Sequence, residues 1–348
     1  MVRLKDIAEA VGTSTSAVSY ALSGRGSSAR ISPDRVREIT EAAMRMGYRA
    51  NAAARSIKMG SFSTVALVLG SRWGINHIPG PLLDGVMRAL EERHLRMLVA
   101  HLPESMTEFA TAAPMLLREL TSDGLLVTLN ESVPPELEEI IVQLRIPTVW
   151  VNDQRPFDAI YPDERTAARI GTRHLLALGH RRLAYAHHAW SSADTSAGHF
   201  SVGERLGGFH DEMQAAGLQP IRAFVREAGE GDDQRSAFAA AMRSLSAADR
   251  PTAVLTYSGG EADTVLTAAI RLGLSLPRDL SLVTFSDQPT RGFGLDITTL
   301  RIPLMQIGVR SVTRLVERIA EAGNRFTSEA VLHELIHGES CVPPPLAG

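Results

Sequence analysis

The 348-residue sequence lacks most features of secreted, membrane-bound or redox-active proteins. Its single cysteine, Cys341, cannot form an internal disulfide, which fits a reducing compartment. No run of about 20 apolar residues occurs, so no transmembrane helix is expected. The first residues, Met1 to Asp6, are charged and unlike a secretory signal peptide. These absences predict a cytoplasmic protein without a membrane partner.

Signatures of catalysis are also scarce. The sequence has no phosphate-loop motif and no nucleophile-elbow motif, and Gly229-Glu230-Gly231 does not extend into a dinucleotide fingerprint. His187-His188 has no cysteine or acidic partner, and His333 and His337 lie in a segment that alternates like a strand. The sequence therefore predicts no enzyme, no cofactor and no metal site.

Charge is distributed unevenly along the chain. The formal net charge is −3, but residues 1–60 hold ten Lys and Arg against five Asp and Glu. This first segment is therefore +5 and the remainder is −8. A basic head on an acidic body is the electrostatic footprint of a DNA-binding protein.

The first 47 residues read as a helix-turn-helix followed by a third helix. Ile7, Ala8 and Val11 fall on one face of a first helix, and Gly12 breaks the pattern where a tight turn is needed. Ser14 is expected to cap a second helix, whose exposed polar N-terminal side chains suit the major groove. A start signal at residues 32–33 and a glycine at residue 47 bound the third helix.

The rest of the chain alternates strands and helices, and the pattern restarts after residue 160. Continuous apolar runs indicate buried parallel strands, and amphipathic stretches indicate the helices between them. Strands are expected at 64–69, 96–101, 123–127, 147–151, 183–186, 252–256 and 280–285, and helices at 82–93, 114–120, 135–144, 166–178, 203–216 and 261–272. This order predicts two doubly wound α/β subdomains with a ligand cleft between them.

Motifs in both parts resemble the LacI family of bacterial transcription regulators. In the head they are Asp6-Ile7-Ala8, Gly12-Thr13-Ser14, Ala17-Val18-Ser19 and residues 47–56, GYRANAAARS. In the body they are residues 123–126 (DGLL), 174–184 (HLLALGHRRLA), 205–209 (RLGGF) and 298–308 (TTLRIPLMQIG). The resemblance covers almost the whole chain. It implies a small all-α helix-turn-helix head on a periplasmic-binding-protein-like α/β body.

The resemblance also implies the domain boundaries. The expected parts are a head over 1–50, a hinge helix and linker over 51–60, and an effector-binding and dimerisation domain over 61–348. The N-subdomain would span about 61–160 and 301–328, and the C-subdomain about 161–295 and 329–343.

By the same resemblance, DNA is contacted by the second helix and the hinge. The implied set is Lys5, Ser14, Thr15, Ser16, Ser19, Tyr20, Asn51, Ala54, Arg55 and Ile57. Ile57 stands where the family places an apolar minor-groove wedge, which kinks the duplex. Three features depart from the family pattern: Arg3 replaces the usual Thr cap, Ala50 replaces the usual Pro, and the 24–30 loop is longer.

The implied effector-binding set is Trp73, Asn76, Asp163, Arg205, Ser258 and Ser286. Arg205 offers a fixed donor fork for hydroxyl or carboxylate oxygens, and its alternative role is that of a surface arginine. The alternative for Asp163 is a helix N-cap, and for Trp73 a loop anchor. Ser286 and Ser258 replace polar groups that the family uses for sugars. The effector is therefore not a typical sugar, or other residues bind it, or the pocket binds nothing.

The main hypothesis is a repressor that binds a pseudo-palindromic operator as a homodimer and responds to a sugar-like effector. Whether the effector is an inducer or a corepressor stays open. One alternative is a small-molecule-binding protein of the periplasmic-binder type, and another is an α/β enzyme. For the head alone, the alternative is a small dimerisation or protein-binding module.

Overall fold

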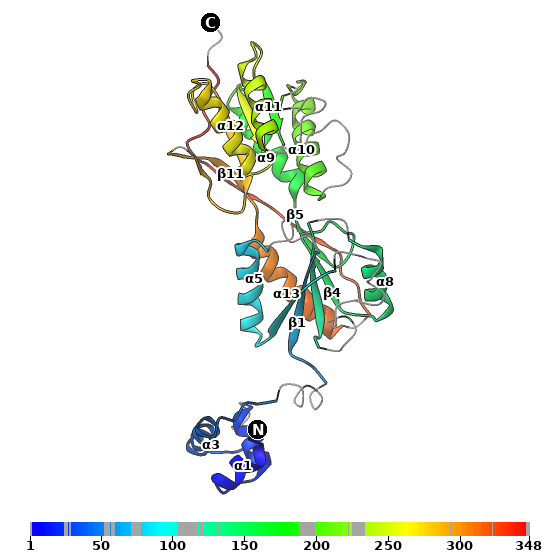
Figure 1. Ribbon diagram of the computed structural model, residues 1–348. Helices are drawn as coiled ribbons and strands as arrows, with labels where there is room; N and C mark the ends of the chain where they lie inside the picture. Colours follow the sequence, from blue (N-terminus) through cyan, green and yellow to red (C-terminus); the bar gives the residue numbers. More distant parts are fainter. Residues whose placement is uncertain are drawn as a thin grey trace. The chain divides into compact units, whose positions relative to one another are not determined.

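The computed structural model describes residues 2–23, 27, 29–51, 56, 60–70, 78–103, 117, 121–130, 133–187, 199–221, 223–224, 234–292, 294–321 and 323–345. The chain falls into two compact units, Met1–Phe62 and Ser63–Gly348 (Figure 1). The predicted helix at 114–120 lies outside the described residues except for Leu117.

The first unit is a bundle of three helices. They are α1 (Leu4–Ala10), α2 (Thr15–Leu22) and α3 (Pro33–Arg45). Ile7, Val18 and Ile39 are fully buried where the three helices meet. Gly12 and Gly47 have φ values of +61° and +68°, which a residue with a Cβ adopts only under strain. The predicted helices, turn and core face of the head are confirmed.

The second unit begins with a six-stranded parallel sheet in the order β12-β5-β4-β3-β1-β2. Its strands are β1 (Thr64–Leu69), β2 (Arg96–His101), β3 (Gly124–Thr128), β4 (Thr148–Val151), β5 (Ala159–Pro162) and β12 (Glu329–Val331). Helices α5 (Gly80–Glu92) and α13 (Leu304–Ala320) pack on one face and α8 (Pro135–Gln143) on the other (Figure 1). Both faces of the sheet are therefore covered, so β1 is buried along its whole length.

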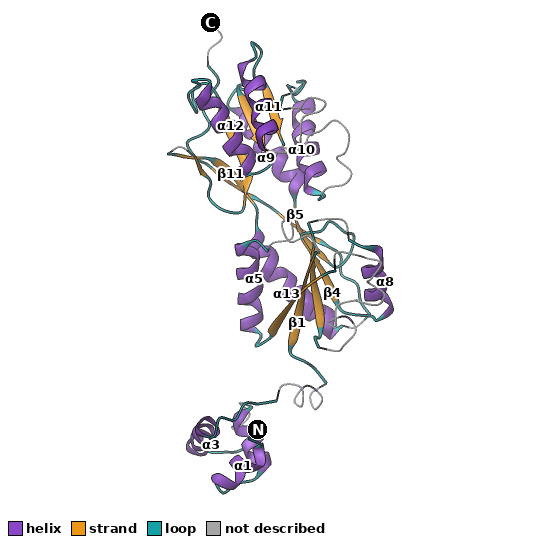
Figure 2. Ribbon diagram, viewed as in Figure 1, coloured by secondary structure: helices purple, strands orange, loops and turns teal. Residues whose placement is uncertain are grey.

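A second sheet has the strand order β13-β11-β8-β7-β6. Its strands are β6 (Leu183–Ala186), β7 (Ala253–Thr256), β8 (Ser281–Ser286), β11 (Thr298–Arg301) and β13 (Glu334–Ile336), of which only β13 runs antiparallel to its neighbour. One face carries α9 (Glu164–Ala177) and α10 (Ser201–Ala215), and the other α11 (Gln234–Ser246) and α12 (Gly259–Arg271). A small ribbon pairs β9 (Arg291–Gly292) with β10 (Leu295–Asp296) (Figure 2).

The chain passes between the two sheets three times. It crosses after β5 at Asp163, after β11 at Ile302-Pro303 and after β12 at Leu332-His333. Strand β12 belongs to the first sheet, so that half extends a few residues beyond the boundary expected near 328. The carboxyl ends of the strands meet at these crossings, where polar side chains from both halves can gather.

The α/β fold class is confirmed, with element ends shifted by a few residues. Six described elements were missing from the sequence-based prediction: β5, α11, β9, β10, β11 and α13. No helix in the described ranges is both long enough and apolar enough to cross a lipid bilayer.

Candidate functional sites

The helix-turn-helix presents a polar surface at the start of α2. The Ser14 hydroxyl accepts a hydrogen bond from the Ala17 amide at 3.1 Å, so it caps the helix as predicted. Thr15, Ser16 and Tyr20 are exposed, and the Tyr20 ring is 45% accessible. An exposed, capped helix start of this kind can offer hydroxyl and phenol groups to base edges.

Arg35 on α3 holds the turn that precedes this helix. Its guanidinium donates to the carbonyl oxygens of Val11 and Gly12 at 2.5 and 3.0 Å, and to Glu38 at 2.6 Å. These bonds satisfy carbonyls at the C-terminal end of α1, which have no partner within the helix. Arg35 could not be singled out from the sequence, because nothing local to α3 indicates contact with a turn 23 residues earlier.

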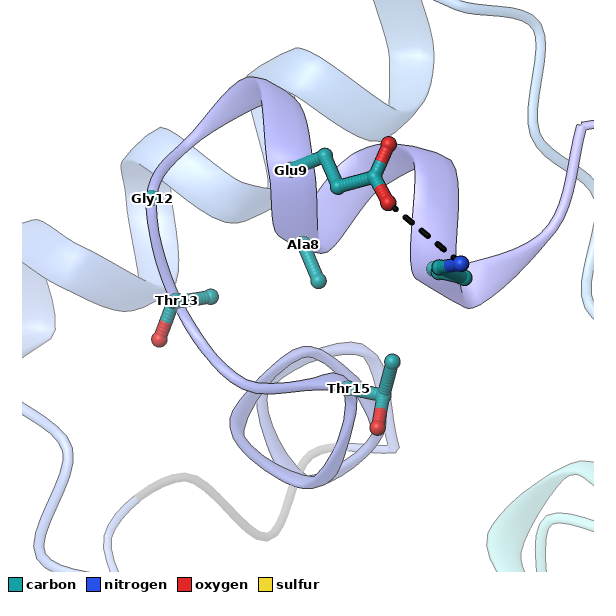
Figure 3. Close-up of a pocket in the computed structure, with 6 residues that line it drawn as sticks. Ala8, Glu9, Gly12, Thr13 and Thr15 are labelled. Atoms are coloured by element: carbon teal, nitrogen blue, oxygen red, sulfur yellow. Dashed lines mark ion pairs between the residues drawn. The ribbon is translucent and has the colours of Figure 1, made fainter.

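An open depression separates α1 from the start of α2. Lys5, Ala8, Glu9, Gly12, Thr13 and Thr15 line it (Figure 3). Lys5 and Glu9 form an ion pair at 3.7 Å, with both side chains largely exposed. Such a pair contributes little stability, so a DNA phosphate could replace the Glu9 carboxylate at the Lys5 ammonium.

The other predicted DNA-binding residues have mixed placements. Ser19, predicted to face outward, is half-buried because it lies beside the buried Val18 at the edge of the packed face. Asn51 is exposed. Ala54, Arg55 and Ile57 lie outside the described residues, so the hinge and its wedge stay predictions.

In the second unit, Arg205 on α10 is bound to Glu164 at the start of α9. The guanidinium donates from Nε and Nη2 to the two carboxylate oxygens at 2.6 and 2.8 Å, and from Nη1 to the Tyr257 carbonyl at 2.6 Å. The Arg205 side chain is 6% exposed and that of Glu164 is 2% exposed. The alternative of a surface arginine is therefore wrong: this donor fork is buried and holds a carboxylate of the chain itself.

Several neighbouring groups act on the charges of this ion pair. Burial alone would raise the pKa of Glu164, but the charge and hydrogen bonds of Arg205, together with the neighbouring His333, outweigh burial and lower the pKa to about 2. The guanidinium also stacks on Phe285, 4.1 Å from the ring centroid. His333, at the third crossing, places Nε2 3.4 Å from the carboxylate without hydrogen-bond alignment, so that contact is electrostatic.

A hydrogen-bonded chain links the two halves beside this pair. His199 Nε2 lies 2.8 Å from the carbonyl oxygen of Asn152 in the first half, and a carbonyl can only accept. Burial lowers the pKa of His199, so the ring is neutral and its Nδ1 accepts from the Ser201 hydroxyl at 2.9 Å. The Ser201 oxygen then accepts from the Tyr257 hydroxyl at 2.8 Å. We call His199, Ser201, Tyr257, Glu164, Arg205 and His333 the crossover cluster.

Three of the remaining predicted effector residues make local hydrogen bonds. Asp163 accepts from the Thr166 amide at 3.1 Å, so it is the N-cap of α9. Ser258 caps α12 by accepting from the Gly260 amide at 3.2 Å. Ser286 accepts from the Gln288 amide at 3.3 Å. Trp73 and Asn76 lie outside the described residues. Whether any of these residues binds an effector stays a prediction.

His199, Ser201 and Tyr257 were not singled out from the sequence. Tyr257 directly follows strand β7, and a polar residue at the carboxyl end of a parallel strand is the signal that could have identified it. His199 has no such signal, because its partner Asn152 is 47 residues away.

Comparisons with known proteins agree with this architecture. Residues 172–341 match the family model of a periplasmic binding protein-like domain. The chain is 26% identical to the HTH-type transcriptional repressor PurR of Edwardsiella ictaluri (strain 93-146), over 99% of this chain and 98% of the relative. The crystal structure of the lac repressor dimer bound to operator and the anti-inducer ONPF has the same fold, with a TM-score of 0.77 and 20% identity, covering 98% of this chain and 99% of that one. A LacI family transcriptional regulator from Mycobacterium smegmatis gives a TM-score of 0.61 at 26% identity, covering 81% and 100%.

These relatives are transcriptional regulators and not enzymes, as the sequence predicts for this chain. The likeness to PurR spans the head and the body together. Together with the motifs, the capped helix-turn-helix and the two-sheet fold with three crossings, it makes this chain similar along its whole length to LacI-family transcriptional regulators with a periplasmic-binding-protein-like domain.

Proposed function

We propose that this chain is a transcription repressor that binds an operator through α2 and is switched by a small molecule at the crossover cluster. The observation that carries the proposal is the start of α2, where Thr15, Ser16 and Tyr20 are exposed above a packed core. The Ser14 cap and the Arg35 bonds fix the turn before it. A rigid helix with an exposed polar start suits the major groove.

A homodimer is supported by the exposed edge of the first sheet. Strand β2 lies at that edge, and its Leu98 and Val99 side chains are 42% and 51% exposed. Met87 on the neighbouring α5 is 50% exposed. A monomer would leave an apolar edge strand open to uncontrolled pairing. Burying this surface against a second copy would place two heads on one duplex, which suits a pseudo-palindromic operator.

The effector that the crossover cluster suits best is a neutral, sugar-like molecule. Glu164 and Arg205 neutralise each other, so the cluster offers no net charge to a ligand. His199, Ser201 and Tyr257 offer an imidazole and two hydroxyl groups, which pair with hydroxyls of a ligand. Because His199 of the cluster also bonds the Asn152 carbonyl of the first half, a ligand there would change how the halves meet. Such coupling alters operator affinity by typically about 1–3 kcal/mol.

The proposal is tested by duplex binding of the full-length chain. We expect affinity for a random-sequence duplex to fall steeply as salt rises, because phosphate contacts release counterions. A chain that binds no duplex at low salt would contradict the proposal and favour the periplasmic-binder alternative.

A variant then tests α2 directly. Tyr20→Ala should weaken binding to an enriched operator by about tenfold or more, while binding to random duplex changes little. Phe157→Ala is the matched control, since this ring in the second unit is also exposed. An unchanged ratio of operator to random binding in Tyr20→Ala would exclude the groove role of Tyr20.

A further inference from the structure

The first half of the second unit contains a cavity of about 560 Å³ away from the crossover cluster. It lies between the end of α8, the start of β4 and the segment that joins α13 to β12. Thr148 begins β4, and Asp158 and Arg325 precede β5 and β12, so the cavity is at the amino ends of these strands. The three crossings lie at the carboxyl ends. Ligand pockets in proteins measure about 300–1,000 Å³, so this cavity has room for a small metabolite.

Arginine dominates the charged lining. Arg145, Arg155, Arg318 and Arg325 face the cavity, and the carboxylates among the described lining residues are Glu138 and Asp158. Arg155 is neutralised locally: it donates to Glu138 at 2.9 Å and to Asp153 at 2.5 Å, and it stacks 3.8 Å over Trp150. Arg318 and Arg325 share the carboxylate of Asp158, and Arg145 has no ion pair among the described residues.

Asp158 does not satisfy all the hydrogen-bond donors of these arginines. Its Oδ1 accepts from the Phe326 amide at 2.9 Å, and the Nε atoms of Arg318 and Arg325 stay at 3.4 and 3.7 Å from its carboxylate. The buried Nε of Arg318 has no hydrogen-bond partner among the described residues. A buried donor without a partner costs free energy, which an acceptor entering the cavity would recover.

Helix ends account for part of this positive charge. Arg145 follows the end of α8 and Arg318 lies in the last turn of α13. A helix C-terminus carries roughly half a negative charge, so the two ends together offset about one guanidinium. The lining guanidiniums stand against Glu138, Asp158 and the two helix ends, which leaves about one positive charge facing the cavity. Asp153, which pairs with Arg155 from outside the lining, offsets that charge, so the case for an anion rests on the Arg318 Nε without a hydrogen-bond partner.

We propose that this cavity is a second ligand site, which binds a small metabolite bearing a phosphate or paired carboxylates. Guanidiniums match both groups, because their planar donor fork forms parallel hydrogen bonds to two oxygens. Ile141 and Pro147 supply apolar lining for the remainder of the ligand. A bound anion would connect the end of α8 to the segment after α13.

The test is calorimetric titration of the full-length chain with pyrophosphate and, separately, with citrate. The head is basic and can bind anions too, so the informative variant is Arg145→Gln with Arg325→Gln. Both side chains are largely exposed, so the double variant should fold. The matched control is Arg271→Gln with Arg278→Gln, two exposed arginines of the second half.

We expect one saturable anion site per chain whose affinity falls tenfold or more in Arg145→Gln/Arg325→Gln and stays within twofold in the control. Tighter binding of pyrophosphate or of citrate would show whether the natural ligand is a phosphate ester or a polycarboxylate. The proposal is overturned if neither anion binds saturably, or if the double variant and the control bind alike.

Discussion

Replacing Arg205 with methionine should destabilise the second unit more than any surface change. The substitution removes both charge-assisted hydrogen bonds to Glu164 while keeping most of the side-chain volume. Glu164 would then be a buried carboxylate without its counterion. Removing one partner of a buried ion pair costs about 3–5 kcal/mol. The lowering of the Glu164 pKa from 4.5 to about 2 gives a similar magnitude, roughly 3 kcal/mol.

The pH dependence of this loss has a definite sign. In the native chain the pKa of Glu164 is depressed, so its stabilisation is present above about pH 4.5 and is lost as pH falls toward 2. In Arg205→Met burial raises the pKa of the carboxylate, and only the neighbouring His333 still lowers it. The free energy of unfolding of the variant is therefore reduced most at neutral pH. We expect the stability gap between native chain and variant to narrow as pH falls from 7 to 4.

Urea denaturation followed by tryptophan fluorescence measures the difference in unfolding free energy between the native chain and the variant. All three tryptophans, at 73, 150 and 190, belong to the second unit. A double-mutant cycle with Glu164→Gln should show a coupling of about 2 kcal/mol or more. Arg278→Met, which breaks an exposed pair, is the control and should cost less than about 1 kcal/mol. If Arg205→Met costs no more than this control, or if the cycle is additive, the reasoning about the buried pair is refuted.

Two further substitutions test the packing of the two units. Ser14→Ala removes the α2 cap, so it should reduce the free energy of unfolding of the head by about 1 kcal/mol. Circular dichroism should show a lower melting temperature. An equal loss of stability in the control Ser16→Ala would show that capping is not the cause. Gly308→Ala should cost about 1–3 kcal/mol in urea denaturation, because its Cβ would lie 2.5 Å from the Leu82 carbonyl oxygen. Gly259→Ala, where a Cβ meets nothing within 4 Å, is its control, and equal stability of the two variants would contradict the close approach of α5 and α13.

The head could be predicted almost completely from the sequence because its signals are local. Gly12, the Ser14 cap and the Ser32-Pro33 start each act within a few residues of their position. Periodicity then determines which side chains face inward. Ser19 departs from this pattern because half-burial at the edge of a packed face depends on the neighbouring helices.

The helices and strands of the body that were not predicted have weak local sequence signals. Helix α13 turns Gly308 and Ser311 inward, because only small residues let it approach α5, and these interrupt its apolar stripe. Helix α11 buries mainly alanines. Strand β11 begins with Thr298 and Thr299, which are buried yet polar, so it does not read as an apolar run.

The site was only partly predictable for a related reason. Arg205 could be singled out by its motif, but its partner Glu164 is 41 residues away and no pattern connects them. Asp163 and Ser258 were expected at the effector site, and each caps the helix that follows it, as the alternative for Asp163 predicted; their contact with an effector stays a prediction. A helix cap can be predicted from the residues next to it, whereas a contact between residues far apart in the sequence cannot.

We propose that a dimer of this chain reads a symmetric DNA sequence. Selection of binding sites by the full-length chain from a random duplex pool, at fixed physiological salt, tests it most directly. We predict an enriched motif of two inverted half-sites, because two copies related by a two-fold axis present two α2 helices. Recovery of no enriched motif, with and without added metabolite mixtures, would contradict the account.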